Sequence, residues 1–431
     1  ELEYLLQDTD AQVALCGLEL LEHIAPLVGQ HGLREVIASA YAEYVTQPVD
    51  LELPEAVRLA PTIPALPGVT PWQQALAAGH SPGPLTAGPD DLCVIPYSSG
   101  TTGNPKGCVH THHSVMATTL YCSVWGNAQH NAVQLVSVPM FHVTGMQVCM
   151  NASIYIGGTQ VVMTRWDRKV AAQLIQRHRI SSWRNISTMV IDLLSDPEID
   201  SYDLSSLTAI GGGGAAMPAA VAHKLLEKTG LEYAEGYGLS ETSPVVTTNR
   251  FDAEEFTATI GLPIPSTEIA IRDEDGKDVK LGEVGEICIR GPQVMKGYWE
   301  RPDETAKVMT KDGYFRSGDM GLMDERGYVK IVDRKKDMIL VSGFNVYPNE
   351  IEEVVVQHPG VLEVAAVGVP DEKSGEVPKL FVVKKDDKVT AEDIIEFTKD
   401  KLTAYKRPKH VEFRKELPKT NVGKILRREL R

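Results

Sequence analysis

The sequence has few cysteines, and no two of them lie close together. Six are scattered along 431 residues: Cys16, Cys93, Cys108, Cys122, Cys149 and Cys288. Without a C-x-x-C pair, this pattern fits neither a typical zinc site nor the dense disulfide framework of a small secreted protein. We therefore expect a protein of the reducing cytoplasm.

Charged residues are missing from one long internal stretch, residues 107–164. Five histidines and several Gly, Pro, Asn and Gln residues interrupt it, so it holds no run of about 20 apolar residues that could span a membrane. The stretch is typical of the interior of a large α/β domain. Residues 1–6 are acidic and amphipathic and lack the basic start of a secretory signal. We expect no integral membrane segment.

Positive charge is also scarce, because 43 Lys and Arg stand against 58 Asp and Glu, a net charge of −15. Nucleic acids and anionic membrane surfaces are therefore unfavourable partners. The last 35 residues, from Phe397, are the exception, with 12 Lys or Arg against 4 Asp or Glu. This local excess suits a small domain that closes over a polyanionic ligand.

Apolar runs alternate with helical stretches in the first half of the chain. The pattern predicts strands at 92–96, 134–138, 160–163 and 207–210, and helices at 170–178 and 219–228, with Pro218 in the first turn of the second helix. Such alternation is the signature of βα units and a mostly parallel sheet.

The pattern changes at about residue 260, where short strands alternate with Gly and Asp turns at 273–276, 311–313 and 324–327. These signals predict an antiparallel β subdomain at about 260–332. Beyond a charged cluster at 333–337 we expect helices at 348–358 and 391–402 and strands at 364–369 and 380–383. The sequence thus predicts a large domain (1–332), a hinge (333–336) and a small α+β domain (337–431).

The clearest chemical motif is the segment Tyr-Ser-Ser-Gly-Thr-Thr-Gly-Asn-Pro-Lys-Gly at 97–107, directly after a predicted strand. Its N–H, hydroxyl and ammonium groups can converge on phosphate oxygens. A Walker A loop would have Ser or Thr after Lys106, but Gly107 follows, so this is a phosphate loop of another kind. The expected phosphate ligands are Ser98, Ser99, Gly100, Thr101, Thr102, Gly103 and Lys106.

A second glycine run, at 211–214, imitates a dinucleotide fingerprint, with Glu235 at a suitable distance for a ribose. That interpretation would make the protein a nicotinamide-dependent dehydrogenase. The fingerprint normally opens a βαβ unit, however, and it leaves the other motifs unexplained, so we do not favour it.

Together with the loop at 97–107, further segments resemble the adenylate-forming (ANL) superfamily of acyl-CoA synthetases, luciferases and adenylation domains of peptide synthetases. The matches run in order along the whole chain, at 139–142, 212–217, 235–242, 315–319, 333–337, 342–344 and 418–427. The resemblance implies a large α/β domain with mostly parallel sheets and a β subdomain, followed by a small mobile α+β domain. Members of the family usually carry a further segment before the part that Glu1 resembles, so we expect the chain to be a fragment or to have lost its start.

The resemblance implies an ATP-dependent, Mg²⁺-requiring acid:CoA ligase that forms an acyl-adenylate and then an acyl-CoA thioester. Alternatives are a carrier-protein-loading or luciferase-like adenylating enzyme and a nucleotide-binding fragment without turnover; a homodimer is a further option. Adenylation domains for amino acids place an Asp after Phe141 to pair the substrate ammonium, but this chain has His142, which favours an acid without an α-amino group. Fatty acids or small thioether acids such as methylmercaptopropionate are expected, and aromatic acids stay open.

Individual roles are also implied by the resemblance. Lys424 would bridge the substrate carboxylate and the α-phosphate, and Lys336 would be the hinge. Tyr237 would stack on adenine, and Asp319 and Arg334 would bind the ribose. Glu241 and Thr101 would hold Mg²⁺ and, with His142 and Lys424, form the catalytic set. The remaining nucleotide contacts would be Gly213, Gly214, Ala215, Glu235, Gly236, Gly238, Thr242 and Ile331. The acyl pocket would be lined by His142, Trp183, Asn185, Gly211 and Gly212, with Trp183 equally able to be core, and CoA would contact Ser342, Gly343 and Phe344. Arg427 and Arg428 are expected to be surface charges.

We expect Lys424→Ala to reduce adenylate formation by about a hundredfold or more, the scale of losing one electrostatic donor to a transition state. Thioester formation from a preformed acyl-adenylate should persist, because charge no longer builds on the α-phosphate. Pyrophosphate release and acyl-CoA formation from synthetic acyl-adenylate, measured separately, check this. Equal losses in both steps would contradict it.

Overall fold

The computed structural model describes residues 2–60, 62–98, 105–126, 129–419 and 425–431. The chain divides into two compact units, Glu1–Ala87 and Gly88–Arg431. The expected hinge at 333–336 lies inside the second unit and stays a prediction.

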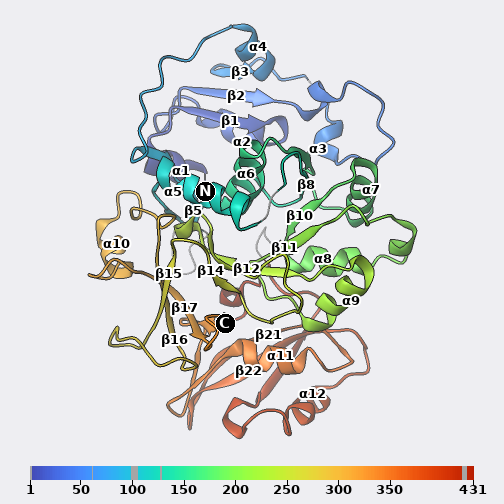
Figure 1. The fold of residues 1–431 in the computed structure, drawn as a ribbon, viewed down its shortest axis with the longest axis vertical. Helices are drawn as coiled ribbons and strands as arrows, with labels where there is room; N and C mark the ends of the chain where they lie inside the picture. Colours follow the sequence, from blue (N-terminus) through green and yellow to red (C-terminus); the bar gives the residue numbers. More distant parts are fainter. Residues whose placement is uncertain (1, 61, 99–104, 127–128, 420–424) are drawn as a thin grey trace. The chain divides into compact units, whose positions relative to one another are not determined.

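The first unit contains a small parallel sheet in the order β1-β2-β3. Its strands are β1 (Val13–Gly17), β2 (Glu35–Ser39) and β3 (Val69–Pro71), and its helices are α1 (Leu2–Thr9), α2 (Leu21–Ile24), α3 (Glu55–Arg58) and α4 (Trp72–Ala77) (Figure 1). The central strand β2 buries Val36 and Ala38 completely. Leu6 of α1 and Leu21 and Ile24 of α2 join the same core cluster.

The second unit is built around a seven-stranded sheet in the order β14-β13-β12-β11-β10-β8-β9. The strands β8 to β12 run parallel, and β13 and β14, at one edge of the sheet, pair antiparallel. The strands are β8 (Val133–Val136), β9 (Thr159–Val162), β10 (Ser182–Asn185), β11 (Ala209–Gly212), β12 (Ala234–Gly238), β13 (Val245–Thr248) and β14 (Leu262–Pro263). Its helices are α5 (His112–Val124), the π-helix η4 (Thr144–Asn151), α6 (Ala152–Tyr155), α7 (Arg168–His178), α8 (Ser187–Leu194) and α9 (Ala219–Thr229). The mostly parallel sheet expected from the sequence is confirmed.

Local chemistry explains where these helices begin. Thr111 and Ser114 form a capping box at the start of α5, each side chain bonding the backbone N–H of the other. The Asp167 carboxylate accepts a bond of 2.8 Å from the Val170 N–H at the start of α7. Pro218 precedes α9 as its N-cap instead of lying in its first turn. The strand expected at 207–210 forms two residues later, because the Leu207 N–H closes a turn onto Leu204.

The uncharged stretch at 107–164 is only partly interior. Leu135 and Val136 of β8 are buried, as expected for a central strand. The outer face of α5 carries Met116, Leu120 and Val124 exposed, so this helix buries one side only. Within the described ranges, none of the helices has the length and apolar character that crossing a membrane requires.

The β subdomain is an antiparallel sheet in the order β15-β16-β17-β18. Its strands are β15 (Glu268–Arg272), β16 (Gly285–Arg290), β17 (Phe315–Met323) and β18 (Val329–Arg334), and α10 (Pro302–Val308) precedes β17. The antiparallel prediction is confirmed. β18 continues through Asp333 and Arg334, however, so the charged cluster begins as a strand paired with Asp319.

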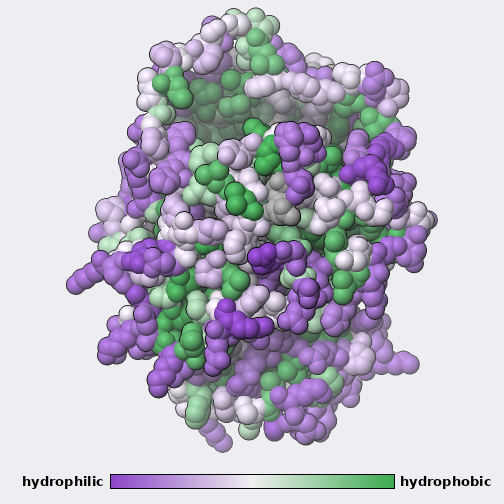
Figure 2. Space-filling model, viewed as in Figure 1, coloured by the Kyte–Doolittle hydropathy of each residue, from purple (hydrophilic) through white to green (hydrophobic). Residues whose placement is uncertain are grey.

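Two short pairs of strands surround the phosphate-loop motif: β4 (Leu92–Val94) with β7 (His110–Thr111), and β5 (Tyr97–Ser98) with β6 (Lys106–Gly107). The C-terminal part has the strands β19 (Ile339–Val341), β20 (Phe344–Val346), β21 (Val361–Asp371), β22 (Gly375–Lys384) and β23 (His410–Arg414), with helices α11 (Pro348–Val355) and α12 (Ala391–Thr398). Ile351 of α11 and Ile394 of α12 pack into one buried cluster with Leu380 and Val382 of β22. Figure 2 shows mainly hydrophilic side chains on the visible surface of this part.

A close backbone approach requires glycine at the end of β11. Gly212 pairs with Asn185 of β10, and a Cβ on Gly212 would lie 1.8 Å from the Asn185 carbonyl oxygen. Such a contact involves backbone on both sides, so the two central strands would have to separate.

We therefore expect Gly212→Ala to lower the free energy of unfolding by about 1 to 3 kcal/mol or more. Gly83→Ala is the control, since a Cβ there meets nothing within 4 Å, and it should stay within about 0.5 kcal/mol of the unmodified protein. Urea unfolding of both variants checks this. An unchanged Gly212→Ala would mean that the strands can accommodate the methyl group.

Candidate functional site

The two ends of the phosphate-loop motif are paired with each other. Ser98 of β5 lies opposite Lys106 of β6. The Lys106 ammonium is 2.5 Å from the Glu304 carboxylate of α10 and 5.0 Å from the centre of the Tyr298 ring. Six predicted site residues lie outside the described residues: Ser99, Gly100, Thr101, Thr102, Gly103 and Lys424.

Tyr298 links this loop to the expected metal ligand. Its hydroxyl donates a hydrogen bond of 2.8 Å to Glu241 Oε1. Burial and the nearby Glu241 carboxylate raise the pKa of Tyr298 far above its usual range, so the hydroxyl stays protonated and keeps donating. The bond leaves Oε2 of Glu241 for another partner. Sequence reasoning missed Tyr298, because no local pattern sets it apart from an ordinary buried tyrosine.

The structure brings together three residues expected at the adenosine part of a nucleotide. The Tyr237 hydroxyl of β12 donates to Asp319 Oδ2 of β17 at 2.5 Å. Arg334 Nε of β18 lies 3.7 Å from the other oxygen of Asp319. Ile331, on the same strand as Arg334, packs with Tyr237 around one apolar cluster. A ring, a carboxylate and a guanidinium from three strands therefore meet at one place.

The glycines around this cluster permit close contact between strands. A Cβ on Gly213 would lie 2.2 Å from the Gly236 carbonyl oxygen, and one on Gly238 would lie 2.0 Å from that of Pro244. Gly214 has a φ of +89° and Ala215 is exposed, so the backbone turns outward after β11.

Glu235 and Thr242 are buried beside these glycines, and each has a protein partner. Burial raises the pKa of Glu235 to about 7, and a carboxylate oxygen accepts a weak bond of 3.4 Å from the Met217 N–H. The Thr242 hydroxyl donates to the Pro244 carbonyl at 2.5 Å.

Residues expected around the acyl group lie on β10 and before η4. Trp183 is fully buried; its indole N–H donates to Ser137 Oγ at 2.9 Å and its ring stacks on Trp166. Asn185 is also buried and accepts a bond of 3.0 Å from the Tyr233 hydroxyl. These contacts agree with the alternative, left open by the sequence, that Trp183 belongs to the hydrophobic core.

His142 stands just before η4. Its ring Nδ1 accepts a bond of 3.2 Å from the Thr144 N–H, and its carbonyl accepts from the Met146 N–H. The ring therefore helps to begin the π-helix.

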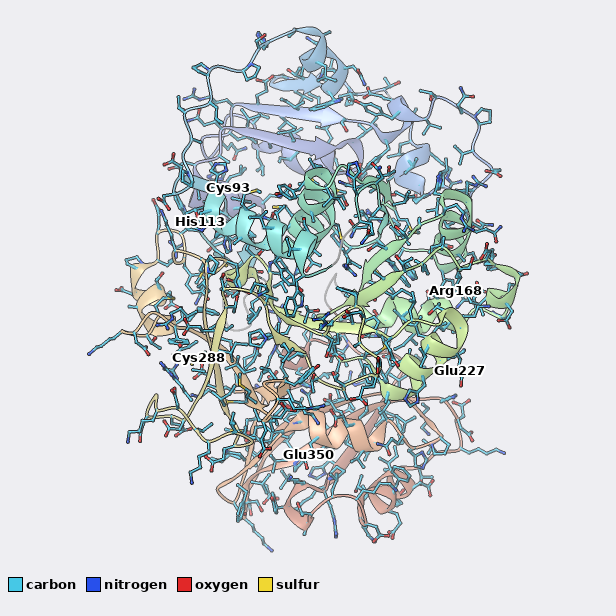
Figure 3. The ribbon with its side chains drawn as sticks, viewed as in Figure 1. Cys93, His113, Arg168, Glu227, Cys288 and Glu350 are labelled. Atoms are coloured by element: carbon cyan, nitrogen blue, oxygen red, sulfur yellow. The ribbon has the colours of Figure 1, made fainter. Side chains whose placement is uncertain are left out.

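The expected CoA contacts are exposed at the turn between β19 and β20. Ser342 has a φ of +51° and Gly343 one of +84°, a pair of values that a tight hairpin turn requires. The Phe344 ring stacks on Tyr405 with 4.8 Å between ring centres. Nearby, Glu350 on α11, labelled in Figure 3, accepts the Lys406 ammonium at 2.6 Å.

The expectation from the sequence that Arg427 is a surface charge is wrong. Its side chain is only 15% exposed and binds the Glu352 carboxylate of α11 at 2.7 Å. It also donates to Asn349 Oδ1 at 2.7 Å and lies 3.6 Å from Asp337 and 3.9 Å from Asp333. We call these five residues the Arg427 cluster. Nothing in the local sequence signals it, because its members lie far apart along the chain.

The Arg427 cluster surrounds the expected hinge. Asp333 ends β18 and is fully buried, and its carboxylate accepts from the Asn349 and Arg334 N–H groups at 2.8 and 2.7 Å. Burial raises the pKa of Asp333 to about 6, although Arg427 opposes the shift. The carbonyl of Lys336, the predicted hinge, accepts a bond of 3.2 Å from Arg431.

In the part of the chain that the structure describes, no group of three His, Cys, Asp or Glu side chains is arranged to hold a metal ion. A Mg²⁺ ion does not need such a cluster, since it is commonly held by one or two carboxylates and the substrate phosphates. The donor set at Glu241, with one oxygen left by Tyr298, fits that second arrangement.

Comparison with known proteins gives consistent matches along the chain. Residues 1–299 match the family model described as AMP-binding enzyme, and residues 350–424 match that of the AMP-binding enzyme C-terminal domain. A long-chain-fatty-acid–CoA ligase of Escherichia coli O157:H7 is 40% identical over 441 residues, covering 100% of this chain and 78% of that protein. One of Bacillus subtilis is 44% identical over 79% of this chain and 61% of its own length. The structure of ATP-bound MatB from Rhodopseudomonas palustris has a TM-score of 0.87 at 28% identity, covering 100% of this chain and 80% of MatB.

We expect Arg427→Met to lower the free energy of unfolding by about 3 to 5 kcal/mol, because it leaves buried carboxylates without their cation. Arg428→Met is the control; this neighbour is exposed, and it should cost at most about 1 kcal/mol. Thermal and urea unfolding measure both. Equal losses in the two variants would show that the Arg427 cluster contributes no special stability.

Proposed function

Since the chain belongs to the family of AMP-binding enzymes, we propose that it is an ATP-dependent acid:CoA ligase acting on fatty acids. The observation that carries the proposal is the 40% identity, over the whole chain, to a protein named as a long-chain-fatty-acid–CoA ligase. The meeting of Tyr237, Asp319 and Arg334 supports it, because these groups can take an adenine face and ribose hydroxyls.

In the first step, a carboxylate oxygen of the acid attacks the α-phosphorus of ATP, and the bond to pyrophosphate breaks. Negative charge spreads over the phosphate oxygens, so cations placed there lower the barrier. We assign this role to Lys424 by its motif. We assign Lys106 to the phosphates. To bind them, its ammonium must leave the Glu304 carboxylate. This exchange costs little, because the ion pair is only partly buried and therefore weak.

In the second step, the CoA sulfur attacks the acyl carbon, the bond to AMP breaks, and the thiol proton leaves to solvent or a base. No side-chain nucleophile takes part. We propose that the exposed turn at Ser342, Gly343 and Phe344 contacts the thiol arm and that the chain pivots at Lys336 between steps.

Mg²⁺ would neutralise charge at the phosphates. Glu241 would hold the ion through Oε2, the carboxylate oxygen that Tyr298 does not bond. Tyr298 orients this carboxylate. The remaining expectations, a cytoplasmic location and a homodimer, stay predictions.

The test is an assay of the purified protein with ATP, Mg²⁺, CoA and hexadecanoic acid. We expect AMP, pyrophosphate and acyl-CoA in equal amounts, and no AMP without the acid. Loading of a carrier protein in place of free CoA, or nucleotide binding without any product, would overturn the proposal.

In the same assay, Glu241→Gln should slow ATP-dependent turnover by about tenfold or more, since a neutral amide binds Mg²⁺ poorly. Its AMP affinity, measured by calorimetry, should change little, because AMP needs no metal. Glu227→Gln, exposed on α9 (Figure 3), is the matched control and should change neither. Parallel losses of turnover and AMP affinity would make Glu241 structural.

A further inference from the structure

Arg184 occupies an unusual place for a cation, on the central strand β10 of the large sheet. Successive side chains of a strand point to opposite faces, so Arg184 lies on the face opposite to Trp183 and Asn185. It is paired in register with Gly211 of β11. Its guanidinium lies 4.0 Å from the centre of the Phe251 ring, and a Cβ on Gly211 would lie 2.9 Å from an atom of that ring. Arg184, Phe251 and Gly211 therefore share one face of the sheet.

No anion in the described part of the chain balances this charge. The side chain of Arg184 forms no hydrogen bond or ion pair with a described residue, and its Nη1 is closed off from solvent. The ionisable groups that act on it most are Cys122, Tyr121, Cys149 and Tyr233.

These four neighbours are neutral at physiological pH. Burial raises the pKa of the Cys122 and Cys149 thiols to about 12, and it raises the pKa of both tyrosines further. Removal from water in turn lowers the pKa of the Arg184 guanidinium. The molecule thus holds a partly buried cation, with its Nη1 closed off from solvent, among thiols and phenols.

Arg184 contrasts with Arg427, which is also largely buried but is surrounded by carboxylates. Nη1 of Arg184, by contrast, is closed off from water without a partner, which destabilises a fold, and a cation retained in such a place is a common mark of a ligand site. Gly211, directly beside it, belongs to the glycine run that the motif comparison assigns to the acyl pocket.

We propose that Arg184 binds a second oxygen-bearing group of the acid, so that the substrate is a fatty acid with a carboxylate at its far end. This inference rests on the proposed function, since it concerns the acid of the same reaction. The group that reacts with ATP is one carboxylate, and Arg184 takes the other. The phenyl and thiol groups around it suit the intervening methylene chain.

A planar guanidinium with an unused N–H recognises a carboxylate through paired, charge-assisted hydrogen bonds. An aromatic acid is a weaker candidate, because the Phe251 ring already covers the guanidinium. A plain fatty acid would place its methyl end against the unpaired charge and leave it unsatisfied.

The experiment measures the rate of acyl-CoA formation from hexadecanedioic acid and from hexadecanoic acid. The same comparison is made with the diacid and the monoacid that are two carbons shorter. The unmodified enzyme should favour the diacid in kcat/KM by about tenfold or more, the scale of a charge-assisted pair. Arg184→Met should remove that preference, so that the ratio of kcat/KM for the diacid to kcat/KM for the monoacid falls to about one. Arg184→Lys keeps the positive charge but lacks the paired N–H groups of a guanidinium, so it should retain part of the diacid preference.

Arg165→Met is the matched control, since Arg165 is exposed and its guanidinium bonds the adjacent Thr164 carbonyl. It should keep the full preference. A monoacid preference in the unmodified enzyme, or a diacid preference that survives Arg184→Met, overturns the inference.

A second measurement separates this inference from the proposed function. Without ATP or CoA, the diacid should raise the melting temperature of the unmodified protein more than the monoacid does, and Arg184→Met should abolish the difference. If monoacids give acyl-CoA but neither effect appears, the ligase proposal stands and the role of Arg184 is wrong. If no acid gives acyl-CoA, the ligase proposal fails, and the melting shifts alone decide whether Arg184 binds a carboxylate.

Discussion

One buried guanidinium, that of Arg427, holds together the region where the large sheet system passes into the C-terminal strands and helices. It lies among the carboxylates of Asp333, Asp337 and Glu352, which come from β18, the residues after it and α11. Removing a cation from such a group leaves several anions dehydrated, so their burial depends on it. Lys424 precedes Arg427 by three residues in the sequence. The Arg427 cluster therefore fixes the chain next to the lysine to which we assign the first chemical step.

The candidate nucleotide site depends on a second long-range contact. Tyr237 and Asp319 are 82 residues apart in sequence, yet their side chains share a short hydrogen bond between the large sheet and the β subdomain. Arg334 reaches the same carboxylate because β18 pairs with β17. The glycines at the ends of β11 and β12 allow these strands to approach one another closely.

Charge balance distinguishes two partly buried arginines that composition alone treats alike. Arg427 has several acidic partners within 4 Å, and its role is to hold the fold. Among the described residues, the ionisable neighbours of Arg184 are neutral and its Nη1 has no acceptor, and Arg184 lies beside the glycine run. The absence of a partner among the described residues is why we assign a substrate group to Arg184 and none to Arg427.

The sequence by itself determined the class of fold, the parallel and antiparallel parts and the order of the motifs, because periodicity and turn residues are local properties. It placed Tyr237, Asp319 and Arg334 in one site only through resemblance, and it took Arg427 for a surface charge. Only the tertiary structure decided which distant side chains meet. Tyr298 bonds Glu241, Arg427 lies among three carboxylates, and Arg184 meets no carboxylate among the described residues. Burial and pairing depend on contacts across the fold, and no local pattern in one chain records them.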